Sequence, residues 1–136
     1  MTTLLTILII LFWGVWGLFA KIASTRIGGE KAFFYDIFSY FILTLIIVAI
    51  FFRKNLFNVD KSGLIAAFLA GIFSSIGGIL FFVLLNKKDA TTVIPLTALY
   101  PMITVILAVV FLKESLTTTK IFGIIFAIAG LLLLNL

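Results

Sequence analysis

The chain has 136 residues, of which 64% are hydrophobic and only 11% are charged. An ordinary soluble domain carries about 25% charged residues, so this composition excludes a water-soluble fold. The formal charge of +5 comes from ten Lys and Arg residues against five acids. The basic residues stand singly or in pairs at the ends of apolar runs, which favours membrane lipid rather than nucleic acid as the partner.

The residue types that several kinds of chemistry require are missing from the sequence. Cysteine and histidine are both absent, which excludes disulfides, thiolate and imidazole catalysis and the usual zinc ligands. The five acids are dispersed along the chain, so they offer neither a metal cluster nor a nucleophile paired with a base. We therefore expect no enzyme, no cofactor and no metal site.

Five apolar runs separated by short polar connections predict five transmembrane helices, because one span needs about 20 apolar residues. The first run follows Met1-Thr2-Thr3, which lacks the basic start of a signal peptide, so we expect it to be retained as a span. Short connections make sequential helices neighbours. The predicted fold is an all-α integral membrane bundle, forming a single domain over residues 1–136, with spans at about 3–24, 32–52, 63–85, 91–112 and 121–136.

The first span carries two tryptophans near its middle, Trp13 and Trp16, although tryptophan normally concentrates at the headgroup level. One interpretation is that the two rings pack over glycines of a neighbouring helix. The other is that they line a solute pathway, since an apolar ring with a single N–H donor suits an amphipathic ligand.

Two charged residues are expected within the hydrocarbon, Lys21 in the first span and Asp36 in the second. Both lie within one or two turns of the same membrane interface, where charged groups can pair or reach toward the headgroups. The functional alternative is that Asp36 couples transport to proton movement.

The third span places small residues on one helical stripe: Ala67, Gly71, Ser74, Ser75 and Gly78. Such stripes allow membrane helices to approach closely. Alternatively, the stripe widens a face that admits solute, and the Ser74 and Ser75 hydroxyls serve as its polar contacts.

The fourth span contains Pro95 and Pro101. A proline inside a helix removes a backbone donor and presses against the carbonyl four residues earlier, which for Pro101 is that of Thr97. This pattern predicts a kink near Pro101, with nearby hydroxyls from Thr97, Tyr100 and Thr104. The kink is either structural, or it is a hinge at which these three hydroxyls contact solute.

The second half of the chain resembles the EamA type of the drug/metabolite transporter superfamily. The resemblance rests on Ala90, Pro95, Tyr100-Pro101, the run Leu112-Lys113-Glu114-Ser115-Leu116-Thr117, and the small residues Gly123, Ala127 and Gly130. The pair Trp13-Gly14 is similar to the opening motif of that family. Typical members have ten spans in two five-span repeats of opposite orientation, so the resemblance implies one such repeat.

The basic residues of the loops select no membrane orientation. The side that holds the N-terminus has five of them: Arg53, Lys54, Lys61, Lys113 and Lys120. The opposite side also has five: Lys21, Arg26, Lys31, Lys87 and Lys88. Because an excess of Lys and Arg normally marks the cytoplasmic side, this balance leaves two interpretations. Either lipid composition or the N-terminal amine decides the orientation, or the chain inserts both ways and forms an antiparallel homodimer.

Taken with the resemblance, these features predict a multi-pass secondary transporter of the cell (inner or plasma) membrane. It would move a small metabolite or an amphipathic solute by alternating access, as a dimer. A structural or accessory subunit of a larger membrane complex is the alternative, because nearly every feature above also has a packing interpretation.

Overall fold

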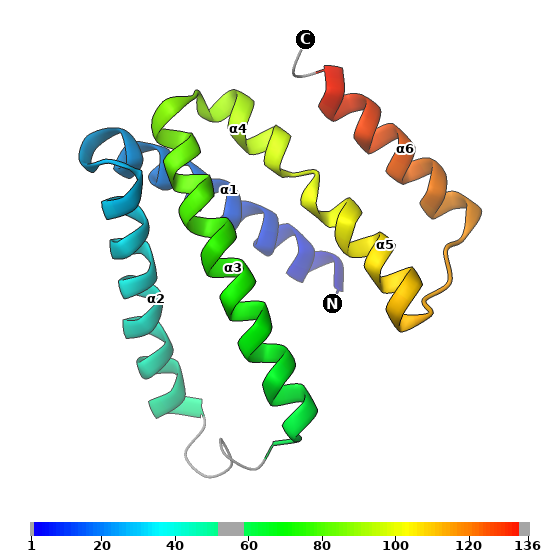
Figure 1. The fold of residues 1–136 in the computed structure, drawn as a ribbon, viewed down its shortest axis with the longest axis horizontal. Coiled ribbons are helices and arrows are strands. Elements are labelled where there is room, and N and C mark those ends of the chain that lie inside the picture. The colour runs from blue at the N-terminus through cyan, green and yellow to red at the C-terminus, as the bar shows by residue number, and fades with distance from the viewer. Residues whose placement is uncertain (1, 52–58, 134–136) are drawn as a thin grey trace. The chain divides into compact units, whose positions relative to one another are not determined.

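The computed structural model describes residues 2–51 and 59–133, and within these ranges every regular element is helical. The helices are α1 (Thr2–Ile27), α2 (Gly29–Phe51), α3 (Lys61–Lys87), α4 (Ala90–Thr97), α5 (Tyr100–Leu112) and α6 (Thr118–Leu133) (Figure 1). The all-α membrane fold predicted from the sequence is confirmed.

Four stretches of the described chain are long and apolar enough to cross a membrane: Thr2–Ile27, Gly29–Ile50, Lys61–Lys87 and Ala90–Leu112. The last helix, α6, is shorter at 16 residues. Large apolar side chains cover the outer surfaces of these helices, and the Phe111 and Phe126 rings are each 73% exposed. Such a surface suits contact with lipid tails rather than water.

The helices extend two or three residues beyond most of the predicted spans, because polar residues at the membrane interface continue the helical hydrogen bonding. The ends of two predicted spans, residue 52 and residues 134–136, lie outside the described residues. The chain divides into two compact units, Met1–Lys87 and Lys88–Leu136, and each is described by itself below. The single domain expected over the whole chain stays a prediction.

In the first unit, α1 and α2 are joined by one residue, Gly28, whose φ of +87° favours glycine. Its N–H donates to the Ser24 carbonyl at 3.1 Å, and its own carbonyl accepts from the Ala32 N–H at 3.0 Å. The three helices of this unit come together near the α1–α2 connection and spread apart toward the other end (Figure 1).

Two glycines permit the close approach of α2 and α3. A Cβ at Gly29 would lie 2.5 Å from the Phe82 carbonyl oxygen, and a Cβ at Gly78 would lie 2.6 Å from Cε2 of Phe33. The Phe33 and Phe82 rings meet edge to face, with centroids 5.9 Å apart. Because α2 and α3 run antiparallel through these contacts, their register is set at this end of the unit.

In the second unit, the predicted fourth span consists of two helices, α4 and α5, interrupted at Ala98 and Leu99. The interruption therefore lies before Pro101, and Pro101 falls in the first turn of α5. Proline is favoured there because the first turn of a helix needs no donor from it. Hydrogen bonds of the 3₁₀ type, between residues three apart, span the interruption. The Leu99 N–H donates to the Leu96 carbonyl at 3.4 Å, and the Met102 N–H donates to the Leu99 carbonyl at 3.0 Å.

Candidate functional site

A hydrogen bond between α1 and α2 joins two of the residues that the sequence singled out. The indole Nε1 of Trp16 donates to Oδ1 of Asp36 at 3.0 Å. Both side chains are half-buried. The indole also stacks on Phe81, with ring centroids 5.4 Å apart, and meets the edge of Phe82 at 6.0 Å. The Trp16 ring is thus held between a carboxylate of α2 and two aromatic rings of α3.

Asp36 lies about 10 Å along the helix axis from the start of α2, given a rise of about 1.5 Å per residue. This position is two turns inside an apolar helix long enough to span a membrane. Tyr40 follows one turn later on the same helical face. The hydroxyl of Ser39 donates to the Asp36 backbone carbonyl at 2.7 Å and not to the Asp36 carboxylate.

Lys21, the other charged residue expected in the hydrocarbon, binds elsewhere. Its Nζ donates to the backbone carbonyl of Leu85 at 2.7 Å, near the C-terminal end of α3. A cation at this position complements the partial negative charge of a helix C-terminus. Lys21 and Asp36 thus contact different groups, and the Asp36 carboxylate uses Trp16 as its hydrogen-bond donor.

The register of α2 against α3 indicates which residue of α3 lies level with Asp36. Gly29 lies against Phe82 and Phe33 lies against Gly78, so each turn forward along α2 matches one turn backward along α3. One further turn brings Ser75 level with Asp36. The α3 face that carries Ser75 therefore continues from the packed end of the unit toward its open end.

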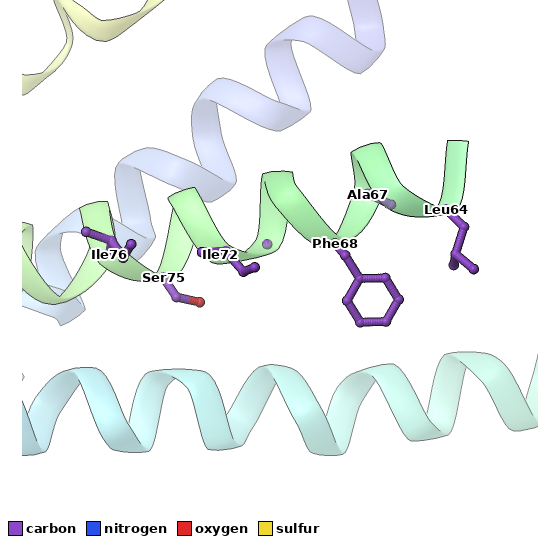
Figure 2. Close-up of a pocket in the computed structure, with 7 residues that line it drawn as sticks. Leu64, Ala67, Phe68, Ile72, Ser75 and Ile76 are labelled. Atoms are coloured by element: carbon purple, nitrogen blue, oxygen red, sulfur yellow. The ribbon is translucent and has the colours of Figure 1, made fainter. Parts of the chain in front are cut away.

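An open cavity of about 570 Å³ lies along this face of α3, and we call it the α3 groove. Small residues four apart form its floor, and larger apolar side chains flank them. Figure 2 shows Leu64, Phe68 and Ser75 on the side of α3 that faces α2. The lining residues are Leu64, Ala67, Phe68, Gly71, Ile72, Ser75 and Ile76.

The structure does not bring every predicted pathway residue of the first unit to this site. Ser75 lines the α3 groove, whereas Ser74, its neighbour in sequence, does not. Trp13 is 63% exposed and takes no part in the ring contacts of Trp16. Phe81 and Phe82 were not singled out from the sequence, although adjacent aromatic residues beyond the Gly77-Gly78 pair were a usable signal.

Of the three predicted hydroxyls of the second unit, those of Thr97 and Thr104 bond within their own helices, and the Tyr100 side chain is exposed. Thr97 Oγ1 donates to the Val93 carbonyl at 2.8 Å and to the Ile94 carbonyl at 3.1 Å. Thr104 Oγ1 lies 3.5 Å from the Tyr100 carbonyl. Such back-bonding often bends membrane helices, and it keeps Thr97 close to the interruption between α4 and α5. Roles of these hydroxyls in a pathway, and of Pro95 and Pro101 as hinges, stay predictions.

Thr104 also lines a second open cavity of about 570 Å³, between α5 and α6 within the second unit. Ala108 of α5 and the small residues Gly123 and Ala127 of α6 contribute to its walls, while Glu114 and Lys120 supply charged groups. Each unit of the described chain thus has an open cavity of this size, and the residues that line the first one do not include Trp16 or Asp36.

Four apolar helical stretches long enough to cross a membrane, in the part of the chain that the structure describes, identify a multi-pass membrane protein. The chain belongs to the EamA-like transporter family, which matches it over residues 1–136. An uncharacterized protein of Methanocaldococcus jannaschii is 32% identical over 133 residues, which cover 98% of this chain and 95% of the relative. No solved structure matches the chain. The resemblance stated from the sequence is confirmed.

Proposed function

We propose that this protein is a secondary transporter that moves a small metabolite or an amphipathic solute across the cell membrane by alternating access. The observation that carries the proposal is the Trp16–Asp36 hydrogen bond, which holds a carboxylate half-buried between two spans. An ionisable group within the membrane is costly, and it commonly marks a substrate or ion pathway. Asp36 is accordingly our candidate for coupling transport to proton movement.

The interruption between α4 and α5 supports the same function. Transporters often build their binding sites and moving parts from discontinuous spans, because an interrupted helix can change direction without breaking many hydrogen bonds. Here the interruption covers only Ala98 and Leu99, with Pro95 and Pro101 on either side. Those two prolines are our candidates for the residues that limit how the two helices can bend.

We further propose that the working unit is an antiparallel homodimer. The family resemblance implies paired repeats of opposite orientation, and two copies of this chain inserted in opposite senses would reproduce that pair. The equal numbers of basic residues on the two sides favour such dual insertion, because neither side has the excess that fixes orientation.

The decisive experiment is transport by purified protein in liposomes. Uptake and efflux of a panel of radiolabelled amino acids, organic cations, organic anions and sugars would be measured under imposed proton and sodium gradients. Protein-free liposomes and liposomes containing an unrelated five-span protein serve as controls. We expect at least one solute class to cross in a gradient-dependent manner. Transport of none of them under any gradient would contradict the proposal and favour an accessory subunit.

A further inference from the structure

The Asp36 carboxylate is incompletely compensated by the described part of the chain. Its side-chain donor there is the neutral indole N–H of Trp16, at 3.0 Å from Oδ1. A neutral donor satisfies one lone pair but leaves the negative charge, which is unfavourable in a medium that water does not fill. Lys21 points its ammonium to the Leu85 carbonyl instead. A ligand with a positive charge would complement Asp36.

The rings around the carboxylate indicate what kind of cation fits. Trp16 stacks on Phe81 and meets the edge of Phe82, and Tyr40 follows Asp36 by one helical turn. Aromatic faces attract weakly hydrated organic cations such as alkylammonium groups. A small metal cation instead prefers several oxygen ligands at once, whereas one carboxylate among aromatic rings offers few.

The α3 groove supplies a place for an apolar portion of the same ligand. Its volume is about 570 Å³, and it is open on one side because all of its lining residues belong to α3. The helix register puts Ser75, one of its lining residues, level with Asp36, and the groove runs from there along Ile72 and Phe68 to Leu64 (Figure 2). Asp36 is not itself a lining residue, and by this register it lies level with the Ser75 end of the groove.

From this arrangement we infer that the solute is an amphipathic organic cation. Its positive group contacts the Asp36 carboxylate beside the Trp16 ring, and its apolar portion lies in the α3 groove, with Gly71 and Ser75 beneath it. This inference rests on the proposed transport function and names the class of its substrate.

The test measures binding rather than transport, in lipid nanodiscs. The chain has two tryptophans, so a Trp13→Phe background leaves Trp16 as the sole indole and its fluorescence as the reporter. The probes are benzyltrimethylammonium, its uncharged isostere neopentylbenzene, and the anion benzenesulfonate. We expect a saturable fluorescence change with the cation alone.

Substitutions then locate the binding site. Asp36→Asn keeps an oxygen that can accept from Trp16 but removes the charge, and we expect it to weaken cation binding about tenfold or more. Asp36→Glu retains the charge and should retain selectivity for the cation, which keeps the test valid if Asp36→Asn misfolds. Asp60→Asn, at an exposed acid before α3, is the matched control and should bind like the parent. Gly71→Leu, which fills the groove floor, should weaken binding of benzyldimethylhexylammonium more than binding of the trimethyl probe.

Equal affinity of the parent and Asp36→Asn for the cation, or equal binding of the three probes, would overturn the inference. This outcome is separate from failure of the proposed function. If the liposomes transport only neutral or anionic solutes, the protein is a transporter but the inference of a cationic substrate is wrong. Conversely, selective cation binding without transport of any solute would support the binding site but contradict the transport function.

Discussion

Gly29 of α2 lies directly against the backbone of Phe82 in α3, so that a Cβ at residue 29 would stand 2.5 Å from the Phe82 carbonyl oxygen. Because the obstructing atoms are backbone, they cannot rotate away. We expect Gly29→Ala to lower the free energy of unfolding by about 1–3 kcal/mol, the usual cost of overpacking. Reversible unfolding in mixed micelles with increasing dodecyl sulfate would measure it. Gly14→Ala, where a Cβ meets no atom within 4 Å, is the control and should not destabilise the protein.

The Trp16–Asp36 hydrogen bond requires an acceptor on residue 36 but not a charge. We therefore expect Asp36→Asn to fold normally, with a free energy of unfolding within about 1 kcal/mol of the parent. The rate of transport should lose its dependence on an imposed proton gradient, because an amide does not titrate. A pH-jump assay in liposomes would show this. An unchanged rate with an unchanged pH dependence would remove Asp36 from proton coupling.

Pro101→Ala should join α4 and α5 into a more continuous helix, because the new backbone N–H can donate toward the Thr97 carbonyl. We expect equal or greater stability and slower turnover. Spin labels at Thr92 and Val110 would report the change, since 18 residues of straight helix span about 27 Å. A variant with full transport activity and a distance equal to that of the parent would reduce Pro101 to a packing residue.

The N-terminus of α3 should respond to pH through Asp60. The Ser62 hydroxyl and then the Gly63 N–H, at 2.9 Å, donate to the Asp60 carboxylate and hold its pKa below the ordinary value. Because the pKa of Asp60 is lower in the folded state than in the unfolded state, the ionised carboxylate stabilises the folded state. This stabilisation is complete at pH values above the unfolded-state pKa, and it is lost as the pH falls through the folded-state pKa. Hydrogen-exchange protection of the Gly63 and Leu64 amides should therefore fall below about pH 4.

The Asp60 prediction is tested with one variant of Asp60 and one control variant. Asp60→Ala should remove most of that pH dependence, together with part of the protection at neutral pH. Asp89→Ala is the matched control, because Asp89 precedes α4 without a side-chain capping hydrogen bond. Protection of the first turn of α3 that stays constant from pH 7 to pH 3 in the parent would contradict the prediction.

The balance of loop charges makes membrane orientation adjustable. Two lysines added within residues 53–62 should drive the chain to one orientation, and two added within 86–89 should drive it to the other. The chain contains no cysteine, so Asn58→Cys and Lys88→Cys can be introduced singly and labelled from each side of intact cells. Labelling of each site from only one side in the parent would contradict dual insertion and favour a fixed topology.

The sequence was sufficient for the membrane class and for the approximate spans, because length and hydropathy are properties of each segment alone. It placed the helix ends less well. The predicted start at residue 32, for example, is Gly29 in the structure, since Glu30 and Lys31 read as loop by composition but continue the helix at the interface. It also predicted a bend near Pro101, and the interruption at Ala98 and Leu99 lies just before that residue.

Contacts between helices required the structure. Trp16 and Asp36 were each selected from the sequence for different reasons, yet nothing in their spacing of 20 residues indicated that they form a hydrogen bond. The pairing depends on how the chain turns back at Gly28 and lays α2 against α1. The position of Ser75, rather than Ser74, in the α3 groove likewise depends on the rotation of α3, which a stripe of small residues does not specify.

The single-residue connection at Gly28 also bears on the order in which the chain assembles during synthesis. Contacts between α1 and α2 join residues close in sequence, so this hairpin can form once two helices have been made. The Lys21–Leu85 contact joins residues 64 positions apart and must await nearly all of α3. A nascent chain halted after α2 should therefore hold the Trp16–Asp36 bond while the Lys21 ammonium still lacks its α3 carbonyl. Late docking of α3 would then complete the first unit.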